Sequence, residues 1–221
     1  MPIVSTFCKK GGVGKTTFLG YLAHFYANQG KTVLIISADD QNSIFKIFGC
    51  ENFVTDNDDD FFENLLVGEK KPEEVVFEAR PGMYLMKTLN TDRLSINLTL
   101  KRSEEKKLRG LIEDFTNYFD YIFIDFPPSS SRLTEILLDI SEKILLVVGL
   151  DPLGIDGYKN TIQYFVDCDI EISKISHIIP IGYHPIKITP NKSLKELKNL
   201  AQNYSPDAII ATPIKDKAVI Q

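Results

Sequence analysis

The stretch "IVSTFCKKGGVGKTT", residues 3–17, decides the fold of this chain, because it leads from a short apolar run through a glycine-rich loop into a helical pattern. After the loop, apolar side chains recur at helical spacing at Phe18, Leu19, Leu22, Ala23 and Tyr26. Gly30 then stops the helix, and a second apolar run, "VLII", occupies residues 33–36. A strand, a helix and a strand in this order form a βαβ unit, which predicts parallel pairing with a right-handed crossover.

Further apolar runs extend this arrangement along the chain. They are "YIFI" at 121–124, "ILLVV" at 144–148 and "ISHIIPI" at 175–181, and continuous apolarity rich in Val and Ile fits strands covered on both faces. Helical patterns occupy residues 104–119, 131–140, 157–166 and 192–203, whereas 51–80 is expected to be irregular helix and loop off the sheet. We therefore predict a single doubly wound α/β domain over residues 1–221, with a mostly parallel sheet and helices on both faces.

The composition narrows the class of protein. With 221 residues, 43% hydrophobic and 25% charged, the chain is long enough for one large domain with a buried core. A net charge of −5 argues against a generally basic nucleic-acid binder and leaves room for a local basic patch. No stretch approaches the roughly 18 apolar residues of a membrane span, and we expect no signal peptide. Three scattered cysteines without a C-x-x-C pair indicate reduced thiols in a cytoplasmic protein.

The loop has the residue types that phosphate binding at the start of a helix requires. Such a site needs free backbone N–H groups aimed at one point, and glycines let the chain come close to the anion. Lys15 supplies a charge for the β- and γ-phosphates, and the Thr16 hydroxyl can ligate Mg²⁺. The strict pattern G-x-x-x-x-G-K-[ST] is missed only at Lys9, where it requires Gly. The residues expected around the phosphates are Gly11, Gly12, Val13, Gly14, Lys15, Thr16 and Thr17.

A plain glycine-rich turn with two surface lysines is the alternative, and the strand before the loop and the helix after it disfavour it. "KKGGVGKT" resembles the deviant Walker A motif of the ParA/MinD family of ATPases, x-K-G-G-x-G-K-[ST]. The resemblance implies a Mg²⁺-dependent ATPase that forms a homodimer around ATP. It also implies that Lys10 reaches across the dimer to the partner's phosphates, where a second cation neutralises charge on the γ-phosphate.

Carboxylates follow two of the predicted strands, at the edge where ligands bind in parallel sheets. "YIFIDFPPS" ends a strand at Asp125 and resembles the family's Walker B stretch, which implies that Asp125 holds Mg²⁺ through a water. "VLIISADDQNS" resembles the family's hhh-D-x-D-P-Q segment, and alignment on Gln41 implies that Asp39 positions the attacking water. Ser37 replaces the family's first Asp, and Asp40 replaces its Pro. The change at Ser37 removes a carboxylate that the family has beside the site, which can slow turnover, whereas Asp39 is retained.

The resemblance covers nearly the whole chain. After the Walker B stretch come a helix, a strand and a loop with an acidic residue before the next helix, as in the family. "HIIPIGYHP", a helix and "ATPIKDKAVIQ" resemble the closing part, which in relatives contributes to the adenine pocket and makes Pro213 a candidate contact with the base. Relatives usually extend into further helices, and no basic amphipathic anchor helix is visible, so we expect no membrane partner.

The family's outputs differ. The ParA branch implies binding to nonspecific DNA by the ATP dimer, with a centromere-binding partner protein, in a nucleoid-associated cytoplasmic protein. Exposed lysines on a helix flank are as often simply solvated. The candidate contacts are Lys192, Lys195, Lys198, Lys215 and Lys217. Alternatives are a nucleotide-gated scaffold or protein-positioning ATPase with little hydrolysis, which only Ser37 supports, and a small-molecule kinase or synthetase, for which no substrate pocket is identifiable. The scattered cysteines exclude a cluster-carrying iron protein.

Overall fold

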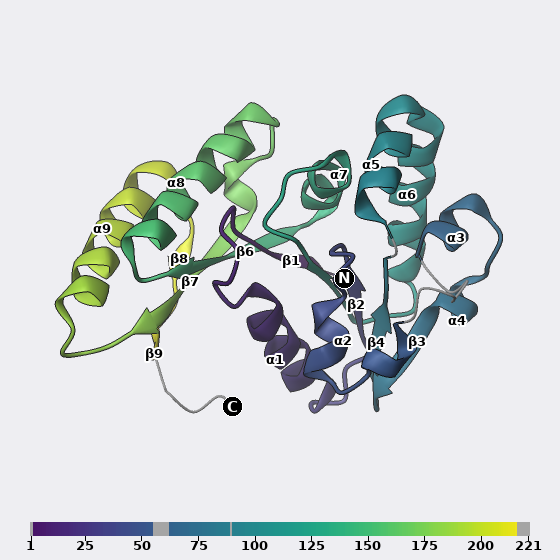
Figure 1. Cartoon of the computed structure of the whole chain (residues 1–221), viewed down its shortest axis with the longest axis horizontal. Coiled ribbons are helices and arrows are strands. Elements are labelled where there is room, and N and C mark those ends of the chain that lie inside the picture. Colours follow the sequence, from purple (N-terminus) through teal and green to yellow (C-terminus); the bar gives the residue numbers. More distant parts are fainter. Residues whose placement is uncertain (1, 55–61, 89, 216–221) are drawn as a thin grey trace. The chain divides into compact units, whose positions relative to one another are not determined.

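The strands form one nine-stranded sheet in the order β3-β4-β2-β5-β1-β6-β7-β8, with β9 also paired to β7 (Figure 1). The structure is a computed structural model that describes residues 2–54, 62–88 and 90–215. The described pairs β2–β4, β2–β5, β6–β7, β7–β8 and β7–β9 are parallel, and β3–β4 is antiparallel. Helices connect the strands, so the predicted α/β fold with a mostly parallel sheet is confirmed.

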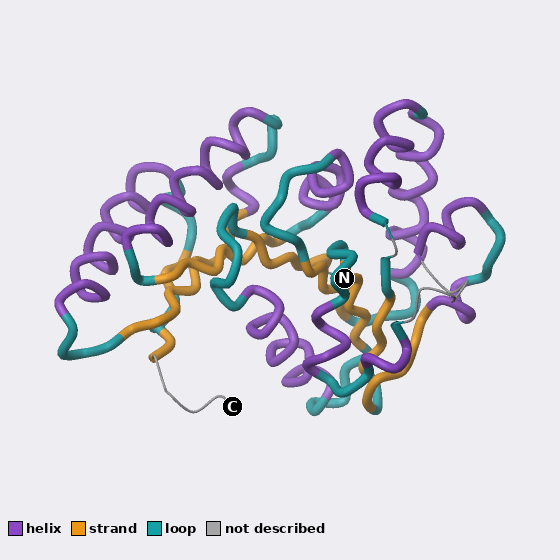
Figure 2. The backbone as a smooth tube through the Cα atoms, in the orientation of Figure 1, coloured by secondary structure: helices purple, strands orange, loops and turns teal. Residues whose placement is uncertain are grey.

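The elements follow the chain in alternation (Figure 2). The strands are β1 (Ile3–Phe7), β2 (Val33–Ser37), β3 (Val76–Arg80), β4 (Met83–Met86), β5 (Tyr121–Asp125), β6 (Lys143–Gly149), β7 (Ile175–Tyr183), β8 (Ile209–Ile210) and β9 (Ile214–Lys215). The helices are α1 (Lys15–Ala27), α2 (Ser43–Ile47), α3 (Phe62–Val67), α4 (Pro72–Val75), α5 (Thr91–Leu100), α6 (Arg102–Phe115), α7 (Arg132–Ile140), α8 (Pro152–Asp167) and α9 (Ile188–Tyr204), with single 3₁₀ turns η1 (Glu51–Phe53) and η2 (Ile172–Lys174).

The chain divides into two compact units. The first unit comprises Met1–Ser5 and Thr16–Glu142, and β2 is its central strand. Residues 33–36 of β2 are completely buried, because parallel neighbours lie on both sides and helices cover its faces. In Figure 1, α1 and α2 lie on one face of this unit's strands, and α5, α6 and α7 lie on the other.

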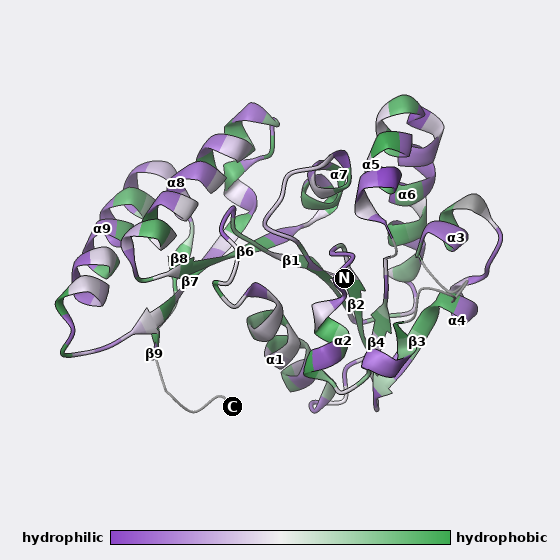
Figure 3. Cartoon of the chain, in the orientation of Figure 1, coloured by the Kyte–Doolittle hydropathy of each residue, from purple (hydrophilic) through white to green (hydrophobic). Residues whose placement is uncertain are grey.

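The second unit comprises Thr6–Lys15 and Lys143–Gln221. Its core consists of β6 and β7, which pair in parallel, with α8 packed on β6 and α9 packed on β7. The two helices also pack against each other, and hydrophobic and hydrophilic positions alternate along both of them (Figure 3). This pattern is typical of helices with one face on a sheet and one face in water.

The structure corrects the prediction for residues 51–80. That segment was expected to leave the sheet, but its last residues form β3, which pairs antiparallel with β4 at the sheet edge. β4 itself was not predicted, although it is a run of four apolar residues and Met83, Leu85 and Met86 are completely buried. α5 was also not predicted, and α8 and α9 begin five and four residues before their predicted starts at 157 and 192. Within the described residues, no helix has the length and apolarity needed to cross a membrane.

Candidate functional site

The residues expected to bind phosphate fall in both units, and each half is described by itself. The glycine-rich loop belongs to the second unit and leads directly into α1. Gly12 and Gly14 have φ values of +71° and +86°, a left-handed region that residues with a Cβ rarely adopt. These conformations turn the chain into the first turn of α1, whose opening N–H groups have no partners within the helix. The backbone therefore has the form of an anion-binding loop at a helix N-terminus.

Lys15 is the first residue of α1, and its side chain lies over the loop that precedes it. Its Nζ donates a hydrogen bond to the carbonyl oxygen of Lys10 at 3.1 Å, and the residue is only 6% exposed. A buried ammonium group over this loop adds a full positive charge where phosphate oxygens are expected to bind. The binding of phosphate by Lys15 stays a prediction.

Lys10 points to a different partner, the carboxylate of Asp151. The Lys10 Nζ and the Asp151 Oδ1 are 3.0 Å apart, and their side chains are 25% and 50% exposed. Asp151 is also the N-cap of α8, since the same oxygen accepts a hydrogen bond from the Gly154 N–H at 2.8 Å. Burial raises the pKa of Asp151, but the hydrogen bonds from Lys10 and from the Gly154 N–H outweigh it, and the pKa is lowered overall. The sequence did not predict this pair; the only signal was an acidic residue before the helix.

Lys9, where the strict motif requires Gly, packs on α8. Its backbone N–H donates to the Thr161 hydroxyl at 3.0 Å, and its Nζ lies 4.5 Å from the centre of the Tyr164 ring. That distance is typical of a cation–π contact. Cys8, the preceding residue, is buried, and burial raises the pKa of its thiol. Lys9, the residue that departs from the strict motif, is therefore held against α8.

The first unit contains the residues expected to hold Mg²⁺. The Thr16 hydroxyl donates to Asp125 Oδ1 at 3.1 Å, and Asp125 is completely buried at the end of β5. A hydroxyl and a carboxylate are oxygen ligands of the kind that Mg²⁺ prefers, and Mg²⁺ usually completes its shell with waters and substrate phosphates. Among the described residues no group of three or more His, Cys, Asp or Glu side chains forms a metal site by itself. The donor set therefore fits Mg²⁺ held jointly with a nucleotide.

Asp39 lies beyond the end of β2, next to the strand that carries Asp125. Its Oδ1 accepts a hydrogen bond from the Gln41 N–H at 3.0 Å, and the residue is partly exposed. Ser37 is the register partner of Asp125, is completely buried, and donates its hydroxyl to the Asp39 carbonyl at 2.9 Å. Asp40 instead accepts hydrogen bonds from the side chains of Gln41 and Thr91, at 3.2 and 3.3 Å.

A brace that the sequence did not predict supports this turn. The Thr88 hydroxyl donates to the Ser37 carbonyl at 2.5 Å, and the Thr88 N–H donates to Asn42 Oδ1 at 3.2 Å. The Asn42 side chain returns a hydrogen bond to the Thr88 carbonyl at 2.8 Å, and its backbone is left-handed with φ 45°. Thr88 and Asn42 are both buried, so their hydrogen bonds hold in place the segment that carries Asp39. Asn is one of the few residues that tolerate this conformation, which was the available signal.

The remaining predicted residues lie in the second unit. Pro213 precedes β9, where Ile214 is the register partner of Ile181. An ideal Cβ on Gly14 would lie 3.7 Å from Ile181 Cδ1, so the C-terminal end of β7, with which β9 pairs, lies next to the glycine-rich loop. The exposed lysines of the prediction are Lys192, Lys195 and Lys198 on α9 and Lys215 on β9. Lys217 lies outside the described residues.

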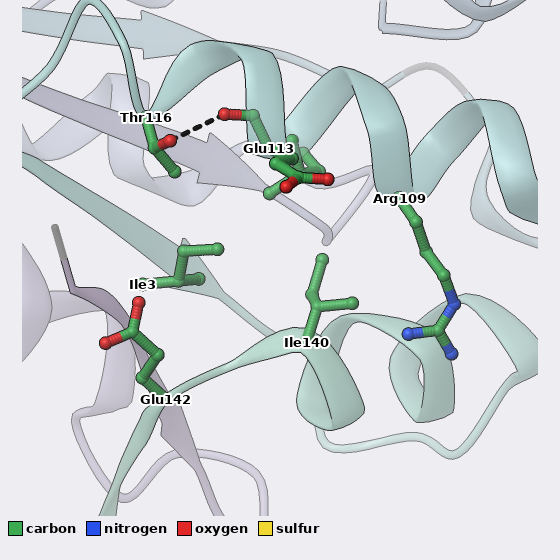
Figure 4. Close-up of a pocket in the computed structure, with 7 residues that line it drawn as sticks. Ile3, Arg109, Glu113, Thr116, Ile140 and Glu142 are labelled. Atoms are coloured by element: carbon green, nitrogen blue, oxygen red, sulfur yellow. Dashed lines mark hydrogen bonds between the residues drawn. The ribbon is translucent and has the colours of Figure 1, made fainter.

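The first unit also has a surface pocket, and none of the residues predicted for the site lines it (Figure 4). Ile3 at the start of β1, Ile140 at the end of α7 and Thr116 after α6 line it. It therefore opens at the N-terminal ends of the parallel strands, whereas ligands of open α/β sheets bind at the C-terminal ends, where Asp125 lies. Arg109 at its rim is engaged by the carboxylates of Glu105 and Asp139, at 3.0 and 2.8 Å. We assign no part of the candidate site to this pocket.

Comparison with known proteins gives a family match over most of the chain. The profile of the AAA domain family (AAA_31) matches residues 1–175. An uncharacterised protein of Pseudomonas putida is 27% identical over 157 residues, which cover 70% of this chain and 59% of that protein. The chromosome partitioning protein ParA of Myxococcus xanthus is 26% identical over 151 residues, covering 67% of this chain and 52% of that protein. The matched part of this chain thus spans between half and three fifths of these relatives.

Solved structures share the fold. The apo structure of McdA from Cyanothece superposes with a TM-score of 0.82 at 18% identity, covering 99% of this chain and 87% of that chain. The McdA(D38A)–ATP complex gives the same TM-score, covering 98% and 84%. Cobyrinic acid a,c-diamide synthase of Mycobacterium smegmatis with ADP and magnesium has a TM-score of 0.78 at 20% identity, covering 90% and 82%. At these identities the likeness concerns the fold.

Proposed function

Because this chain belongs to the AAA domain family and, within it, to the ParA/MinD group of deviant Walker A ATPases, we propose that it is a Mg²⁺-dependent ATPase that dimerises around ATP and acts in DNA partition. In this proposal the protein is cytoplasmic and switches between a monomer and an ATP-bound dimer. Its partners are a second copy, nonspecific DNA and a centromere-binding protein. Plasmid or chromosome partition is the process it would serve.

The observation that carries the proposal is that the two lysines of the loop have different partners. Lys15 lies over its own loop, where it serves the phosphates bound by the same chain. Lys10 Nζ is held by Asp151 at the start of α8. A lysine that is not committed to its own loop is available to a second subunit, and only ATP presents a γ-phosphate for it to bind.

Hydrolysis forms a bond between a water oxygen and the γ-phosphorus, breaks the bond from that phosphorus to the β–γ bridging oxygen, and yields ADP, phosphate and a proton. Asp39 orients this water, and its Oδ1 is fixed by the Gln41 N–H. Thr16, joined to Lys15 by a peptide bond, and Asp125 would hold Mg²⁺, which would supply charge neutralisation on the phosphates. Gly11, Gly12, Val13, Gly14 and Thr17 complete the phosphate loop, and Pro213 contacts the base.

Two features support partition of DNA as the output. One relative is by name a chromosome partitioning protein, ParA of Myxococcus xanthus. Three lysines on α9, Lys192, Lys195 and Lys198, are exposed at three-residue spacing, which places them along one flank of the helix. Such a flank binds phosphates rather than base edges, so the affinity for DNA would fall steeply with salt.

A second candidate is a nucleotide-gated scaffold or protein-positioning ATPase that hydrolyses little ATP and does not bind DNA. Ser37 favours it, since a buried hydroxyl stands where the family has a carboxylate, beside Asp125. The fold is equally that of McdA. Turnover measured with and without DNA separates the two candidates. If DNA and the partner protein accelerate turnover by the ATP dimer, the result supports partition. If turnover stays very slow with both, the result supports the scaffold.

The deciding experiment measures the mass in solution with ADP and with a slowly hydrolysed ATP analogue, followed by titration with nonspecific DNA at two salt concentrations. A dimer that forms only with the analogue, and binds DNA less tightly at high salt, is the expected result. A dimer that ignores DNA would favour the second candidate. A monomer with both nucleotides would contradict the dimer switch, because Lys10 would then have no partner site to complete.

A further inference from the structure

Thr88 holds the turn that carries Asp39 from a neighbouring strand of the first unit. β4 pairs with β2 as far as Met86, the register partner of Ile36, and the ladder between the two strands ends there (Figure 1). Two residues further along, the Thr88 hydroxyl donates to the carbonyl oxygen of Ser37, the last residue of β2, at 2.5 Å. A side chain therefore continues the bonding between the strands at the point where the turn begins.

The side chain of Asn42 closes the other end of the same turn. Its Oδ1 accepts the Thr88 N–H at 3.2 Å, and its Nδ2 donates to the Thr88 carbonyl at 2.8 Å, as the backbone of a neighbouring strand would. The same Nδ2 also donates to the Asp40 carbonyl at 3.1 Å. All three polar groups of Thr88 thus bond to the turn, and Thr88 and Asn42 are 0% and 2% exposed, so water does not replace these bonds.

Within the turn, hydrogen bonds converge on the backbone of Asp39. Its carbonyl oxygen accepts both the Ser37 hydroxyl and the Asn42 N–H, each at 2.9 Å. Its carboxylate accepts the Gln41 N–H at 3.0 Å, and the residue stays partly exposed. The backbone of Asp39 is therefore fixed while its carboxylate stays accessible, which is the arrangement that orienting a water requires.

Ser37 contributes a bond that a carboxylate at this position could not make. An ionised carboxylate only accepts hydrogen bonds, whereas a hydroxyl also donates. The Ser37 hydroxyl donates to the Asp39 carbonyl, and the Ser37 carbonyl accepts from Thr88, so the residue connects the two strands to the turn. The departure from the family pattern at this position thus comes with its own support for Asp39.

We propose that Thr88 and Asn42 position Asp39 for hydrolysis, and that the Ser37 hydroxyl takes part in this positioning and so supports turnover. The inference rests on the proposed ATPase function and names further residues on which its rate depends. All three act through the backbone of Asp39, so they are positioning residues. On this inference Ser37 gives no support to the second candidate, a scaffold that hydrolyses little ATP.

The first test compares Thr88→Val with Thr88→Ser. Valine keeps the shape of threonine and removes the hydroxyl from the Ser37 carbonyl, whereas serine keeps that hydroxyl. Thr88→Val is expected to lower kcat on the order of ten-fold, because a small displacement of a positioned group is costly, and to leave KM for ATP unchanged. Thr88→Ser should retain the wild-type kcat. A wild-type kcat in Thr88→Val, or an equal loss in Thr88→Ser, would overturn the role of the hydroxyl.

The matched control is Thr6→Val, the same change at a completely buried threonine whose hydroxyl has no hydrogen-bond partner among the described residues. It should leave kcat unchanged. If Thr88→Val does not fold, Asn42→Gly takes its place, because glycine tolerates the left-handed backbone and leaves space for water to reach the Thr88 backbone. Asn42→Gly should lower kcat as well, and a wild-type kcat in this variant would equally overturn the inference.

The second test is Ser37→Ala, which removes the hydroxyl from the Asp39 carbonyl and keeps the Ser37 carbonyl for Thr88. If position 37 has only lost a carboxylate, this substitution changes nothing. We expect kcat to fall about three- to ten-fold, the size of one hydrogen bond. An unchanged kcat would exclude Ser37 from the positioning of Asp39.

Hydrogen exchange separates failure of this inference from failure of the proposed function. Amide exchange of the nucleotide-free chain, followed by peptide mass spectrometry, measures the protection of residues 38–42 and does not depend on hydrolysis. Thr88→Val should speed exchange in this segment, and Thr6→Val should not. Faster exchange in Thr88→Val, in a wild-type background that hydrolyses no ATP, would retain the closure of the turn and remove the proposed enzyme. Normal wild-type hydrolysis with unchanged exchange in Thr88→Val would retain the proposed function and remove the role of Thr88.

Discussion

Lys10 and Lys15 lie five positions apart in one loop and bond to different partners, so we expect the two side chains to have different roles. Lys15 is buried and donates to the carbonyl of Lys10, so its charge is directed into the loop. Lys10 is paired with a carboxylate on α8. The two side chains should therefore affect nucleotide binding and dimerisation separately, which substitution can test.

Replacing Lys15 by Ala is expected to abolish nucleotide binding, because the loop loses the only charge that lies inside it among the described residues. Binding of a fluorescent ATP analogue, followed by anisotropy, measures this directly. Circular dichroism provides the control for folding. A variant that binds the analogue as tightly as the wild type would show that the phosphates do not bind at this loop.

Replacing Lys10 by Ala should give a monomer that still binds nucleotide, since Lys10 Nζ is engaged by α8 and not by its own loop. Light scattering with the slowly hydrolysed analogue shows the oligomeric state, and anisotropy shows the nucleotide affinity. We expect the affinity to stay within about three-fold of the wild type, the effect of a partly exposed charge. Normal ATP-dependent dimerisation of this variant would contradict the in-trans role.

Replacing Asp39 by Ala should slow hydrolysis by at least about 10²-fold, the usual contribution of a group that positions or deprotonates a nucleophile. The ATP-bound dimer should then accumulate. The matched control is Asp40→Ala, because Asp40 bonds to the side chains of Gln41 and Thr91 and has no assigned role in the reaction. Phosphate release and light scattering on both variants test the assignment, and it is wrong if the Asp39 variant turns over at the wild-type rate.

At the scale of elements, an ion-pair network connects α6 and α7. Glu105 accepts hydrogen bonds from Arg132 at 2.8 Å and from Arg109 at 3.0 Å, and Arg109 also pairs with Asp139 at 2.8 Å. The hydrogen bond from Arg132 is the largest cause that lowers the pKa of Glu105, and burial opposes it only in part. The carboxylate is therefore more stable in the folded chain than in the unfolded chain.

The pH dependence follows from this direction. Because the folded-state pKa is lowered, the stabilisation is fully present above the unfolded pKa of about 4.3 and is lost as the pH falls through the folded value. Glu105→Gln should therefore lower the free energy of unfolding by about 1 kcal/mol at neutral pH, a size limited by solvent screening. The difference from the wild type should disappear in acid. Urea unfolding at several pH values measures it.

The control for this prediction is Glu104→Gln, since Glu104 has a single lysine partner, Lys107, at 3.5 Å. Its effect on the free energy of unfolding at neutral pH should be smaller. A loss of stability that is equally large for both variants, or that grows in acid, would mean that the network between α6 and α7 does not stabilise the fold.

How well the sequence predicted each element depended on its burial. β1, β2, β5, β6 and β7 were predicted because continuous apolar runs signal strands covered on both faces. β3 was missed because it mixes apolar with charged residues and two of its apolar residues are partly exposed, and β4 was missed because its apolar run has none of the Val and Ile that are typical of buried strands. α5 was missed because its apolar residues give little helical periodicity, and its start depends on a cap in which Asn90 Oδ1 accepts the Arg93 N–H at 2.8 Å.

The residues of the candidate site likewise differ in how far the sequence could predict them. The loop residues and Asp125 carry local motifs, so sequence predicted them, and the structure pairs Thr16 with Asp125. The partners that hold these residues are remote in sequence: Asp151 lies 141 positions from Lys10, and Thr88 lies 51 positions from Ser37. Contacts of this separation are created by the order of the strands, and no local pattern encodes them. The roles of all the site residues stay predictions, and the substitutions above test those of Lys10, Lys15 and Asp39.

At the scale of the whole molecule, the net charge of −5 repels DNA, so binding would depend on a local surface. Among the described residues, the three lysines on the α9 flank form no ion pair, and removing them should weaken DNA binding in a salt-dependent way. The variant Lys192→Ala/Lys195→Ala/Lys198→Ala should reduce the slope of log affinity against log salt by about 2–3, close to one for each phosphate that the protein no longer neutralises.

A control variant changes the net charge equally at exposed lysines on other elements, Lys46→Ala/Lys106→Ala/Lys143→Ala. Anisotropy of a labelled DNA duplex at several salt concentrations, with the ATP analogue present, compares the two variants. Equal loss of affinity in both would indicate a general charge effect rather than a binding surface. No loss in the α9 variant would remove this flank from the DNA proposal.

The distribution of thiols has a practical consequence for following the protein in real time. Cys8 and Cys50 are buried, and the raised pKa of Cys8 further reduces its reactive thiolate, whereas Cys168 is partly exposed. Cys168 is the C-cap of α8, at the other end of the helix whose first turn ties Lys10. A maleimide dye should therefore attach selectively to the unaltered chain at this one position, as a fluorescent reporter at the end of the helix whose N-cap pairs with Lys10.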